Sequence, residues 1–248
     1  MYNCMCTLTY LPQKNGDFLL TSNRDESPLR AIARHPEIRD VSRGKILFPV
    51  DGKAGGTWIA TSNDRRAVCL LNGAFVPYKM GGTYRLSRGV MVLQSFEYSG
   101  LDVFAAEYDF DGMEPFTFVG IDYQENKVGI LELRWDGTAL HQRIYNPKQA
   151  HIWSSVQLYK PEIIVRRETW FQEWLKKHPT HQLEDVQNFH QFGGEGDVYH
   201  DIRMNRDNRV RTVSTTAIES RGATVRMHYA DLLTGEKAVA NLDVVQME

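Results

Sequence analysis

Stretches that predict β-strands alternate in blocks with stretches that predict α-helices, and this order restricts the fold more than any other feature of the sequence. The predicted strands are residues 6–11, 18–22, 55–62, 66–72, 116–121, 128–135, 139–145, 212–218 and 223–229. The predicted helices are residues 87–108, with a break near Gly100, then 161–177 and 182–192. Residues 193–209 are polar and predict a long surface loop. Blocks in this order favour a layered α+β fold, in which helices pack on sheets.

Length and composition favour one globular domain over residues 1–248 and exclude several other classes. The 42% of hydrophobic and 24% of charged residues argue against disorder and coiled coils. A net charge of −2 gives no general positive field, so we expect no nucleic-acid partner. The longest apolar runs, such as residues 67–71, are far shorter than the roughly 20 residues of a membrane span. Because the start of the chain lacks the pattern of a secretory signal, we expect a cytoplasmic location.

Neither the cysteines nor the histidines predict a metal site or a disulfide framework. Cys4, Cys6 and Cys69 are too few for such a framework, and Cys69 lies in an apolar run that predicts a buried thiol. Pro179 separates His178 from His181 and breaks any shared helical face. The sequence also has no phosphate-binding loop of the GxxxxGK[ST] type. We therefore expect no metal and no cofactor.

Cys6 is a candidate nucleophile because it lies at the start of a predicted strand near the beginning of the chain. If Cys6 became the first residue, its α-amino group, with a pKa of about 8, could act as general base for the thiol. A thiolate also needs a cation to lower its pKa and donors for a developing oxyanion. Arg24, Asp25 and Asn72 are residues of suitable types at predicted strand ends. The alternative is that Cys6 is a small buried strand residue and that Arg24 and Asp25 form a surface ion pair.

Four short motifs in order along the chain resemble the NRDE family, also called the transport and Golgi organisation protein 2 family. The motifs are Met5-Cys6, Asn23-Arg24-Asp25-Glu26, Gly55-Gly56-Thr57-Trp58 and Thr212-Val213-Ser214-Thr215-Thr216. The resemblance runs over the full length of the chain. It implies the fold of the N-terminal-nucleophile hydrolases, a four-layer αββα sandwich.

The resemblance also implies roles for individual residues. Cys6 would be the nucleophile, Arg24 and Asp25 would position and tune it, and Asn72 would donate a hydrogen bond to an oxyanion. The residues that would contact the substrate are Asn23, Glu26, Gly56, Thr57, Trp58, Ser155 and Arg211. Ser155 stands where the family tends to have Asn.

Two positions depart from the pattern of the family. Five residues precede Cys6, so amine-assisted catalysis requires either translation from Met5 with removal of that Met, or cleavage of a pentapeptide. The Arg of the last motif is replaced by Val213, and Arg211 is two positions away as a possible substitute.

Two functions follow as hypotheses, both with a small-molecule partner. The first is a cysteine-dependent hydrolase of non-peptide C–N amide bonds that forms an acyl-enzyme on Cys6. The second is a non-catalytic carrier of haem or another hydrophobic metabolite, held in a pocket lined by Trp58, Phe75 and Tyr78. The sequence does not determine the oligomeric state.

Overall fold

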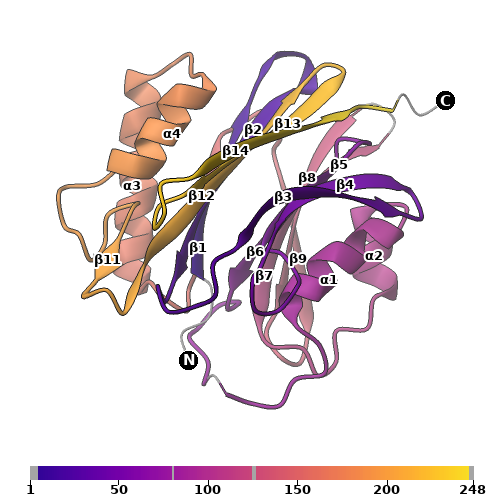
Figure 1. The fold of residues 1–248 in the computed structure, drawn as a ribbon, viewed down its shortest axis with the longest axis horizontal. Coiled ribbons are helices and arrows are strands. Elements are labelled where there is room, and N and C mark those ends of the chain that lie inside the picture. The colour runs from indigo at the N-terminus through magenta and orange to yellow at the C-terminus, as the bar shows by residue number, and fades with distance from the viewer. Residues whose placement is uncertain (1–4, 80, 125–126, 246–248) are drawn as a thin grey trace.

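Two antiparallel β-sheets face each other in the centre of the molecule, and a pair of helices covers the outer face of each sheet (Figure 1). The computed structural model describes residues 5–79, 81–124 and 127–245, without the side chains of Met5, Cys6 and Gln124. Of the five residues that precede Cys6, whose removal amine-assisted catalysis would require, residues 1–4 lie outside the described part and Met5 is described by its backbone alone.

Every strand pairing in the two sheets is antiparallel. In spatial order, the first sheet consists of β10 (His151–Ser154), β1 (Met5–Pro12), β2 (Phe18–Glu26), β12 (Val210–Arg221), β13 (Thr224–Asp231) and β14 (Lys237–Asp243), with β11 (Asn205–Arg206) paired to β12. The second sheet consists of β3 (Arg34–Val41), β4 (Gly44–Val50), β5 (Ile59–Ser62), β6 (Ala67–Asn72), β7 (Phe116–Gln124), β8 (Lys127–Trp135) and β9 (Leu140–Tyr145).

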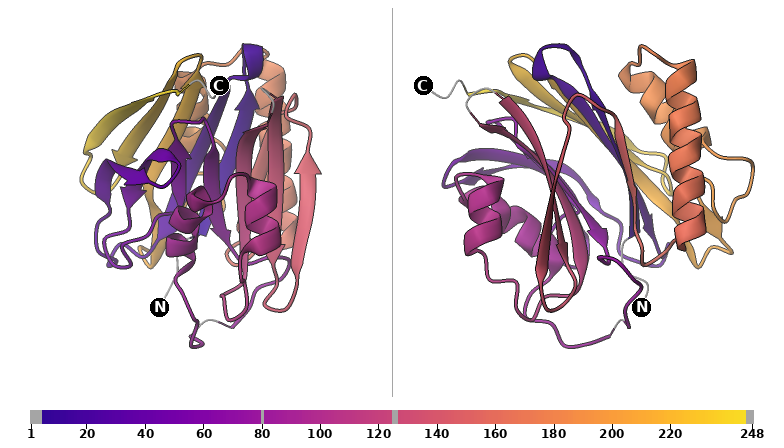
Figure 2. Two further views of the ribbon diagram at one scale, coloured as in Figure 1. Left: turned by 90° about the vertical axis from the view of Figure 1, so that its right-hand side faces the viewer. Right: turned by 180° about the vertical axis from the view of Figure 1, so that it is seen from behind.

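The helices form the two outer layers. They are α1 (Arg88–Gln94), α2 (Leu101–Glu107), α3 (Pro161–Lys177) and α4 (Leu183–Phe192), together with the short 3-10 turns η1 (Lys14–Gly16) and η2 (Ser95–Glu97). Helices α3 and α4 lie against the first sheet, and α1 and α2 lie against the second (Figure 2). The predicted four-layer αββα sandwich is confirmed.

An apolar core lies at each interface between layers. Leu8 and Leu20 of the first sheet and Ile59 and Ile121 of the second belong to the cluster between the sheets. A second cluster joins the second sheet to α1 and α2, and a third joins the first sheet to α3 and α4. The predicted burial of the Cys69 thiol is confirmed, because Cys69 belongs to the central cluster.

Five strands were not predicted from the sequence: β3, β4, β10, β11 and β14. Three of them, β3, β10 and β14, lie at sheet edges. Strand β3 is exposed or half-buried along its whole length, and β14 alternates in burial but exposes Val239. Strand β4 is fully buried at its end but contains Pro49, a residue that argues against a strand in a sequence.

The structure corrects two boundaries. The strand predicted to end at Ser22 continues through Glu26, and all of its residues are buried. The predicted surface loop over residues 193–209 contains the short strand β11 and buries Ile202 and Met204. In β2 buried polar residues interrupt the hydrophobic pattern from which strands are predicted, whereas in residues 193–209 the two buried apolar residues are each flanked by polar ones.

Two further observations concern the described residues alone. No helix among them is long and apolar enough to cross a membrane. No group of three or more His, Cys, Asp or Glu side chains among them is arranged to hold a metal ion.

Candidate functional site

The pleat of β2 divides the Asn23-Arg24-Asp25-Glu26 motif between two faces of the first sheet. Asn23 and Asp25 hydrogen-bond to groups of the helical side, whereas Arg24 and Glu26 contact residues on the side of the second sheet. Successive side chains of a strand point to opposite faces, so this division follows from the strand continuing through the motif. The four residues therefore belong to two different environments.

Asn23 attaches α4 and the following segment to the sheet. Its Nδ2 donates to the carbonyl oxygens of His190, at 2.8 Å, and Ile202, at 3.1 Å. Its Oδ1 accepts from the Thr215 hydroxyl at 2.9 Å and lies 3.1 Å from Nδ1 of His190. Burial, together with the charge of Arg167, lowers the pKa of His190 to about 3, so the ring is neutral at pH 7. These contacts satisfy the Asn23 side chain completely.

Asp25 is fully buried on the same face as Asn23. Its Oδ2 accepts from the Tyr159 hydroxyl at 2.8 Å, and its Oδ1 accepts from the Thr212 hydroxyl at 2.6 Å. Burial raises the pKa of Asp25 to about 6, although the charge of Arg167 and the two hydrogen bonds act in the opposite direction. Asp25 is therefore a carboxyl group whose protonation changes near neutral pH.

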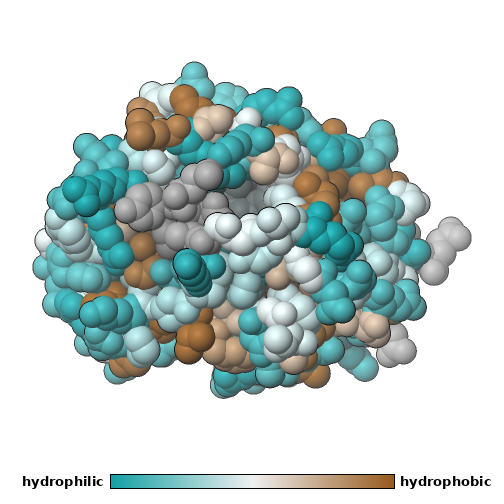
Figure 3. Space-filling view, turned by 90° about the horizontal axis from the view of Figure 1, so that it is seen from below, coloured by the Kyte–Doolittle hydropathy of each residue, from teal (hydrophilic) through white to brown (hydrophobic). Residues whose placement is uncertain are grey.

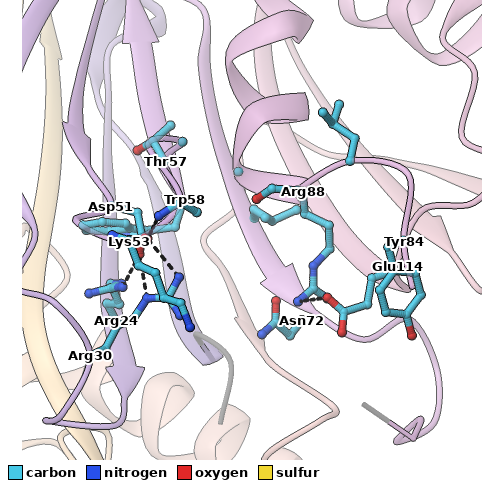
Figure 4. A pocket seen from close by; sticks show the side chains of 16 residues that line it. Arg24, Arg30, Asp51, Lys53, Thr57, Trp58, Asn72, Tyr84, Arg88 and Glu114 are labelled. Atoms are coloured by element: carbon cyan, nitrogen blue, oxygen red, sulfur yellow. Dashed lines mark hydrogen bonds and ion pairs between the residues drawn. The ribbon is translucent and has the colours of Figure 1, made fainter. Parts of the chain in front are cut away.

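Arg24 points into the space between the sheets and is held there by Asp51 (Figure 4). Nη2 of Arg24 lies 2.5 Å from Oδ2 of Asp51, and its guanidinium carbon lies 4.6 Å from the centre of the Trp58 ring. Arg30 donates to both oxygens of Asp51 at 2.9 Å. The backbone N–H groups of Lys53 and Ala54 donate to Oδ1 of the same carboxylate.

Asp51 is thus the centre of this cluster. Burial acts to raise the pKa of Asp51, but the hydrogen bond from Arg30 and the charge of Arg24 outweigh it and lower the pKa. Glu26 lies behind the two arginines, 3.5 Å from Arg30 and 4.0 Å from Arg24. Burial raises the pKa of Glu26 against the charges of both arginines.

A cavity of about 460 Å³ lies between the two sheets beside Arg24. The surface seen from below is hollowed near its centre (Figure 3). The cavity is lined by Arg24, Arg30, Asp51, Lys53, Ala54, Gly56, Thr57, Trp58, Leu70, Asn72, Tyr84, Leu86, Ser87, Arg88, Gly89 and Glu114. The lining is therefore mainly polar and charged, and it joins β2 of the first sheet to β6 and α1 on the other side.

Arg88 and Glu114 form a second ion pair on the opposite side of the cavity (Figure 4). Nη2 of Arg88 lies 2.8 Å from Oε2 of Glu114. Nη1 of Arg88 donates to the Tyr78 hydroxyl at 2.9 Å and to the Pro115 carbonyl oxygen at 2.7 Å. These contacts fix the beginning of α1 against the end of the second sheet.

Asn72 is the last residue of β6 and lines the cavity, and its side-chain amide has an unused hydrogen-bond donor among the described residues. Its side chain is buried, and Nδ2 has no hydrogen-bond acceptor among the described residues. Its backbone oxygen accepts from the Ser155 hydroxyl at 2.7 Å. Ser155 is itself buried and does not line the cavity, so it contacts Asn72 from behind.

Gly56, Thr57 and Trp58 form a tightly packed part of the lining. A Cβ on Gly56 would lie 2.3 Å from the carbonyl carbon of Gly89, which only glycine avoids. The backbone N–H of Thr57 donates to the Gly89 oxygen at 3.0 Å, and its hydroxyl donates to the Ile59 oxygen. Nε1 of Trp58 is buried and has no acceptor in the described part of the chain.

The remaining predicted residues lie elsewhere or are only partly described. The backbone of Cys6 is paired with Arg24 in the register of β1 and β2, and its side chain is outside the described part. Arg211 pairs with Glu26 along β12, and its side chain reaches Asn208 at 3.4 Å instead of the cavity.

The pocket proposed for the carrier is corrected in part. Trp58 lines the cavity, but Tyr78 lies behind Arg88 and Phe75 is half-exposed and packs edge-on against His141. None of the described lining residues is His, Met or Cys.

Sequence reasoning missed Arg30, Asp51, Lys53, Arg88 and Glu114. One signal could have indicated Asp51, because Asp51-Gly52-Lys53 directly precedes the Gly55-Gly56-Thr57-Trp58 motif, and Asp followed by Gly is typical of a tight turn. The backbone N–H of Asp51 donates to Gly56 at 2.8 Å, which closes this turn. The others lie in no motif and reach the cavity through folding alone.

This arrangement can bind a polar or anionic group and stabilise negative charge. Arg24, the residue paired with Cys6, supplies a buried cation, and Asn72 supplies a buried N–H donor across the cavity. A cation lowers the pKa of a neighbouring thiol, and a buried donor stabilises a developing oxyanion.

The sequence agrees with one family model, described as Transport and Golgi organisation 2, over residues 4–229. The chain belongs to this family. The match confirms the resemblance drawn from the four motifs. No curated protein sequence matches the chain.

Solved structures share the fold of this Transport and Golgi organisation 2 family member at low sequence identity. The N-acylethanolamine-hydrolyzing acid amidase orthologue of Caenorhabditis elegans is 12% identical with a TM-score of 0.58, over 86% of this chain and 92% of that one. A mutant and a second variant of the conjugated bile acid hydrolase of Clostridium perfringens are 10% and 11% identical, each with a TM-score of 0.58, over 96% of this chain and 92% of theirs. This likeness establishes the N-terminal-nucleophile hydrolase-like fold.

Proposed function

We propose that this protein is a cysteine-dependent hydrolase of non-peptide C–N amide bonds, with Cys6 as the nucleophile. The observation that carries the proposal is the pairing of Cys6 with Arg24 in the sheet, at the edge of a cavity that Asn72 also lines, with its buried Nδ2 lacking an acceptor among the described residues. Residues directly opposite each other in an antiparallel pair share one face of the sheet, so position 6 lies on the face of Arg24. Of the solved structures with this fold, one is by its name an amidase that hydrolyses N-acylethanolamines, and another is a hydrolase of conjugated bile acids.

In the proposed reaction, the Cys6 sulfur attacks the amide carbonyl carbon and the thiol proton passes to the leaving amine. Arg24 stabilises the thiolate, and Asn72 donates to the oxyanion of the tetrahedral intermediate. The C–N bond breaks to leave a thioester on Cys6, and water then releases the carboxylic acid. Asp51 keeps Arg24 in position, and Ser155 does the same for the end of β6.

Asn23 and Asp25 act indirectly in this proposal. They connect β2 to the helical layer from the face opposite the cavity, and so fix the strand that carries Arg24. Glu26 balances the charge of Arg24 and Arg30. The predicted contact of Arg211 with substrate has no support from its position and is not part of the proposal.

The decisive experiment combines thiol labelling with turnover. Intact mass of the protein produced from its own gene first determines whether the chain starts at Cys6. Iodoacetamide should then alkylate Cys6 faster than the buried Cys69, and Cys6→Ala should abolish hydrolysis of N-acyl amides. Cys69→Ala, checked for folding by circular dichroism, is the matched control and should keep turnover. Full turnover in Cys6→Ala would refute the nucleophile.

The role of Arg24 is tested separately. Arg24→Gln should slow alkylation of Cys6 at pH 7 about tenfold, since removal of a neighbouring cation raises the pKa of the thiol. Arg24→Lys keeps the charge and should recover most of the rate. Equal rates in all three proteins would remove this role from Arg24.

The carrier of haem or another hydrophobic metabolite is the second function that the same cavity supports. Its cations can pair with the acidic groups of such a ligand, and a carrier needs neither a basic amine on Cys6 nor turnover. Stoichiometric ligand retention by Cys6→Ala, together with no turnover by the unaltered protein, would establish it. The cytoplasmic location stays a prediction of the sequence.

A further inference from the structure

Cations outnumber carboxylates around the cavity. Arg24, Arg30, Lys53 and Arg88 line it, against two lining carboxylates, Asp51 and Glu114. Glu26 lies behind Arg24 and Arg30 and still leaves the cations in excess. A net positive lining favours a ligand that carries negative charge.

The excess is concentrated on one side. Arg24, Arg30, Lys53 and Trp58 lie around Asp51 in Figure 4, and we refer to these four lining residues as the cationic wall. Its three cations still outnumber Asp51 and Glu26. The Arg88–Glu114 pair on the other side is neutral as a pair, and its guanidinium also donates to Tyr78 and Pro115. A negative group would therefore be drawn to the cationic wall.

The cationic wall is rigid where it meets the cavity. Asp51 receives donors from both arginines and from the backbone of Lys53 and Ala54, so a single carboxylate holds the loop and the two guanidinium groups together. Lys53 is exposed at the surface end of this wall, whereas Arg24 is buried at the inner end. Preorganised cations of this kind lose little freedom when they bind an anion.

Two buried donors add to this preference. Trp58 and Asn72 line the same cavity, and neither the buried Nε1 of Trp58 nor the buried Nδ2 of Asn72 has an acceptor among the described residues. A buried N–H without a partner is unfavourable, and a ligand oxygen that accepted from it would remove this cost. Both N–H groups thus lack an acceptor in the described part of the chain, and the Arg24 guanidinium lies beside the Trp58 ring.

We propose that this site recognises substrates bearing an oxyanion group, a carboxylate or a phosphate, bound at the cationic wall with Lys53 at its entrance. The inference rests on the proposed hydrolase, for which it names the substrate class. The reacting carbonyl lies between the position of Cys6 and Asn72, and the oxyanion group lies a few bonds away toward Lys53 and Trp58. Neutral N-acyl amides of the same size bind less tightly.

The test uses two matched pairs of ligands and separates binding from turnover. N-octanoylglycine is compared with neutral N-octanoylglycinamide, and N-octanoyl-phosphoethanolamine with neutral N-octanoylethanolamine. Isothermal titration calorimetry on Cys6→Ala measures binding without hydrolysis. At low salt each anion should bind at least tenfold more tightly than its neutral partner, and the larger ratio identifies the preferred group. The ratio should fall as salt is raised.

Lys53→Gln should reduce the preference to about threefold or less, and Lys53→Arg should restore it. Lys148→Gln, on an exposed turn far along the chain, is the control and should keep the ratio of the unaltered protein. Equal or tighter binding of both neutral ligands, or binding of none of the four up to millimolar concentration, would overturn the inference. Turnover without anion preference would contradict only this inference, and anion preference without turnover would contradict only the hydrolase.

Discussion

Asp25 is a carboxyl group whose charge is disfavoured by its surroundings. It has no exposed surface and accepts hydrogen bonds from Tyr159 and Thr212, while the charges of Arg167 and Arg206 favour its ionised form. Its pKa of about 6 in the folded protein exceeds the value of about 3.9 expected for an unfolded chain. Protonation therefore stabilises the folded state at this residue.

This difference predicts how stability depends on pH. Between about pH 4 and pH 6 the folded state holds the Asp25 proton more strongly than the unfolded state, so the contribution of Asp25 to the free energy of unfolding falls as pH rises. The total loss is about 3 kcal/mol at most, and it is complete above pH 6. Asp25→Asn removes this contribution.

The free energies of unfolding of the unaltered protein and of Asp25→Asn are measured in urea at several pH values between 4 and 7.5. The difference between the two at each pH gives the contribution of Asp25. His190 titrates in the opposite sense, because its pKa is lowered, and subtraction cancels it. Asp40→Asn, on an exposed pair with Lys45, is the control. A difference between the unaltered protein and Asp25→Asn that does not vary with pH would contradict the shift.

Replacement of Asp51 should lower the stability of the fold for a different reason, the loss of an ion-pair partner. Asp51→Asn leaves Arg24 and Arg30 with Glu26 as the remaining ion-pair partner shown for them in the described residues. Removal of one member of a buried ion pair costs about 3 kcal/mol or more. We expect a lower free energy of unfolding in urea and, because Arg24 is no longer held, slower alkylation of Cys6. Unchanged stability would show that Asp51 is not the centre of the cluster.

At the scale of elements, the loop before β5 and the start of α1 touch through two glycines. Gly56 approaches Gly89 so closely that any Cβ overlaps the backbone, and the Thr57 N–H bonds to the Gly89 oxygen. The loop that carries Asp51 and Lys53 is therefore attached to the helix that carries Arg88. Both sides of the cavity are parts of one connected unit.

Gly56→Ala should separate these two elements. The added methyl must displace the backbone of Gly89, and overpacking of this kind costs about 1–3 kcal/mol. Differential scanning fluorimetry should show a lower melting temperature, with weaker binding of ligand as a second effect. Gly129→Ala is the control, since its Cβ would lie 4.0 Å from the nearest atom, and it should cause little change.

The elements themselves were largely predictable, whereas the site was only half predictable. Helix α3 combines a first-turn Pro161, an apolar face and terminal lysines, and all three signals agreed with the structure. Edge strand β3 escaped prediction because it is exposed or half-buried throughout, and β14 because its exposed face carries the apolar Val239. The motifs identified Arg24 and Trp58, and the end of a predicted strand identified Asn72. The partners Asp51, Arg88 and Glu114 are brought to the cavity by the tertiary fold, which a sequence alone does not specify.

At the scale of the whole molecule, the core between the sheets joins both halves of the sandwich. Residues of β1, β2 and β12 from one sheet pack there against residues of β5, β6 and β7 from the other. If one sheet unfolded alone, the apolar inner face of the other sheet would be exposed to solvent. This shared core supports the prediction that residues 1–248 form one domain.

One domain should unfold in one cooperative step. Trp135 and Trp153 report on the two sheets and Trp174 on the helical layer, so fluorescence samples most of the structure. The urea transition seen by fluorescence should coincide with that seen by far-ultraviolet circular dichroism. Two separate transitions would indicate independent domains.

The alternation along β2 has a consequence for engineering this fold. Arg24 and Glu26 form one functional module with the Asp51 loop, and Asn23 and Asp25 form another with α4 and Tyr159. A designer who moves the cavity onto a related scaffold needs only every second residue of the motif, together with the loop. The intervening residues should be taken from the recipient, whose own helices they must fit.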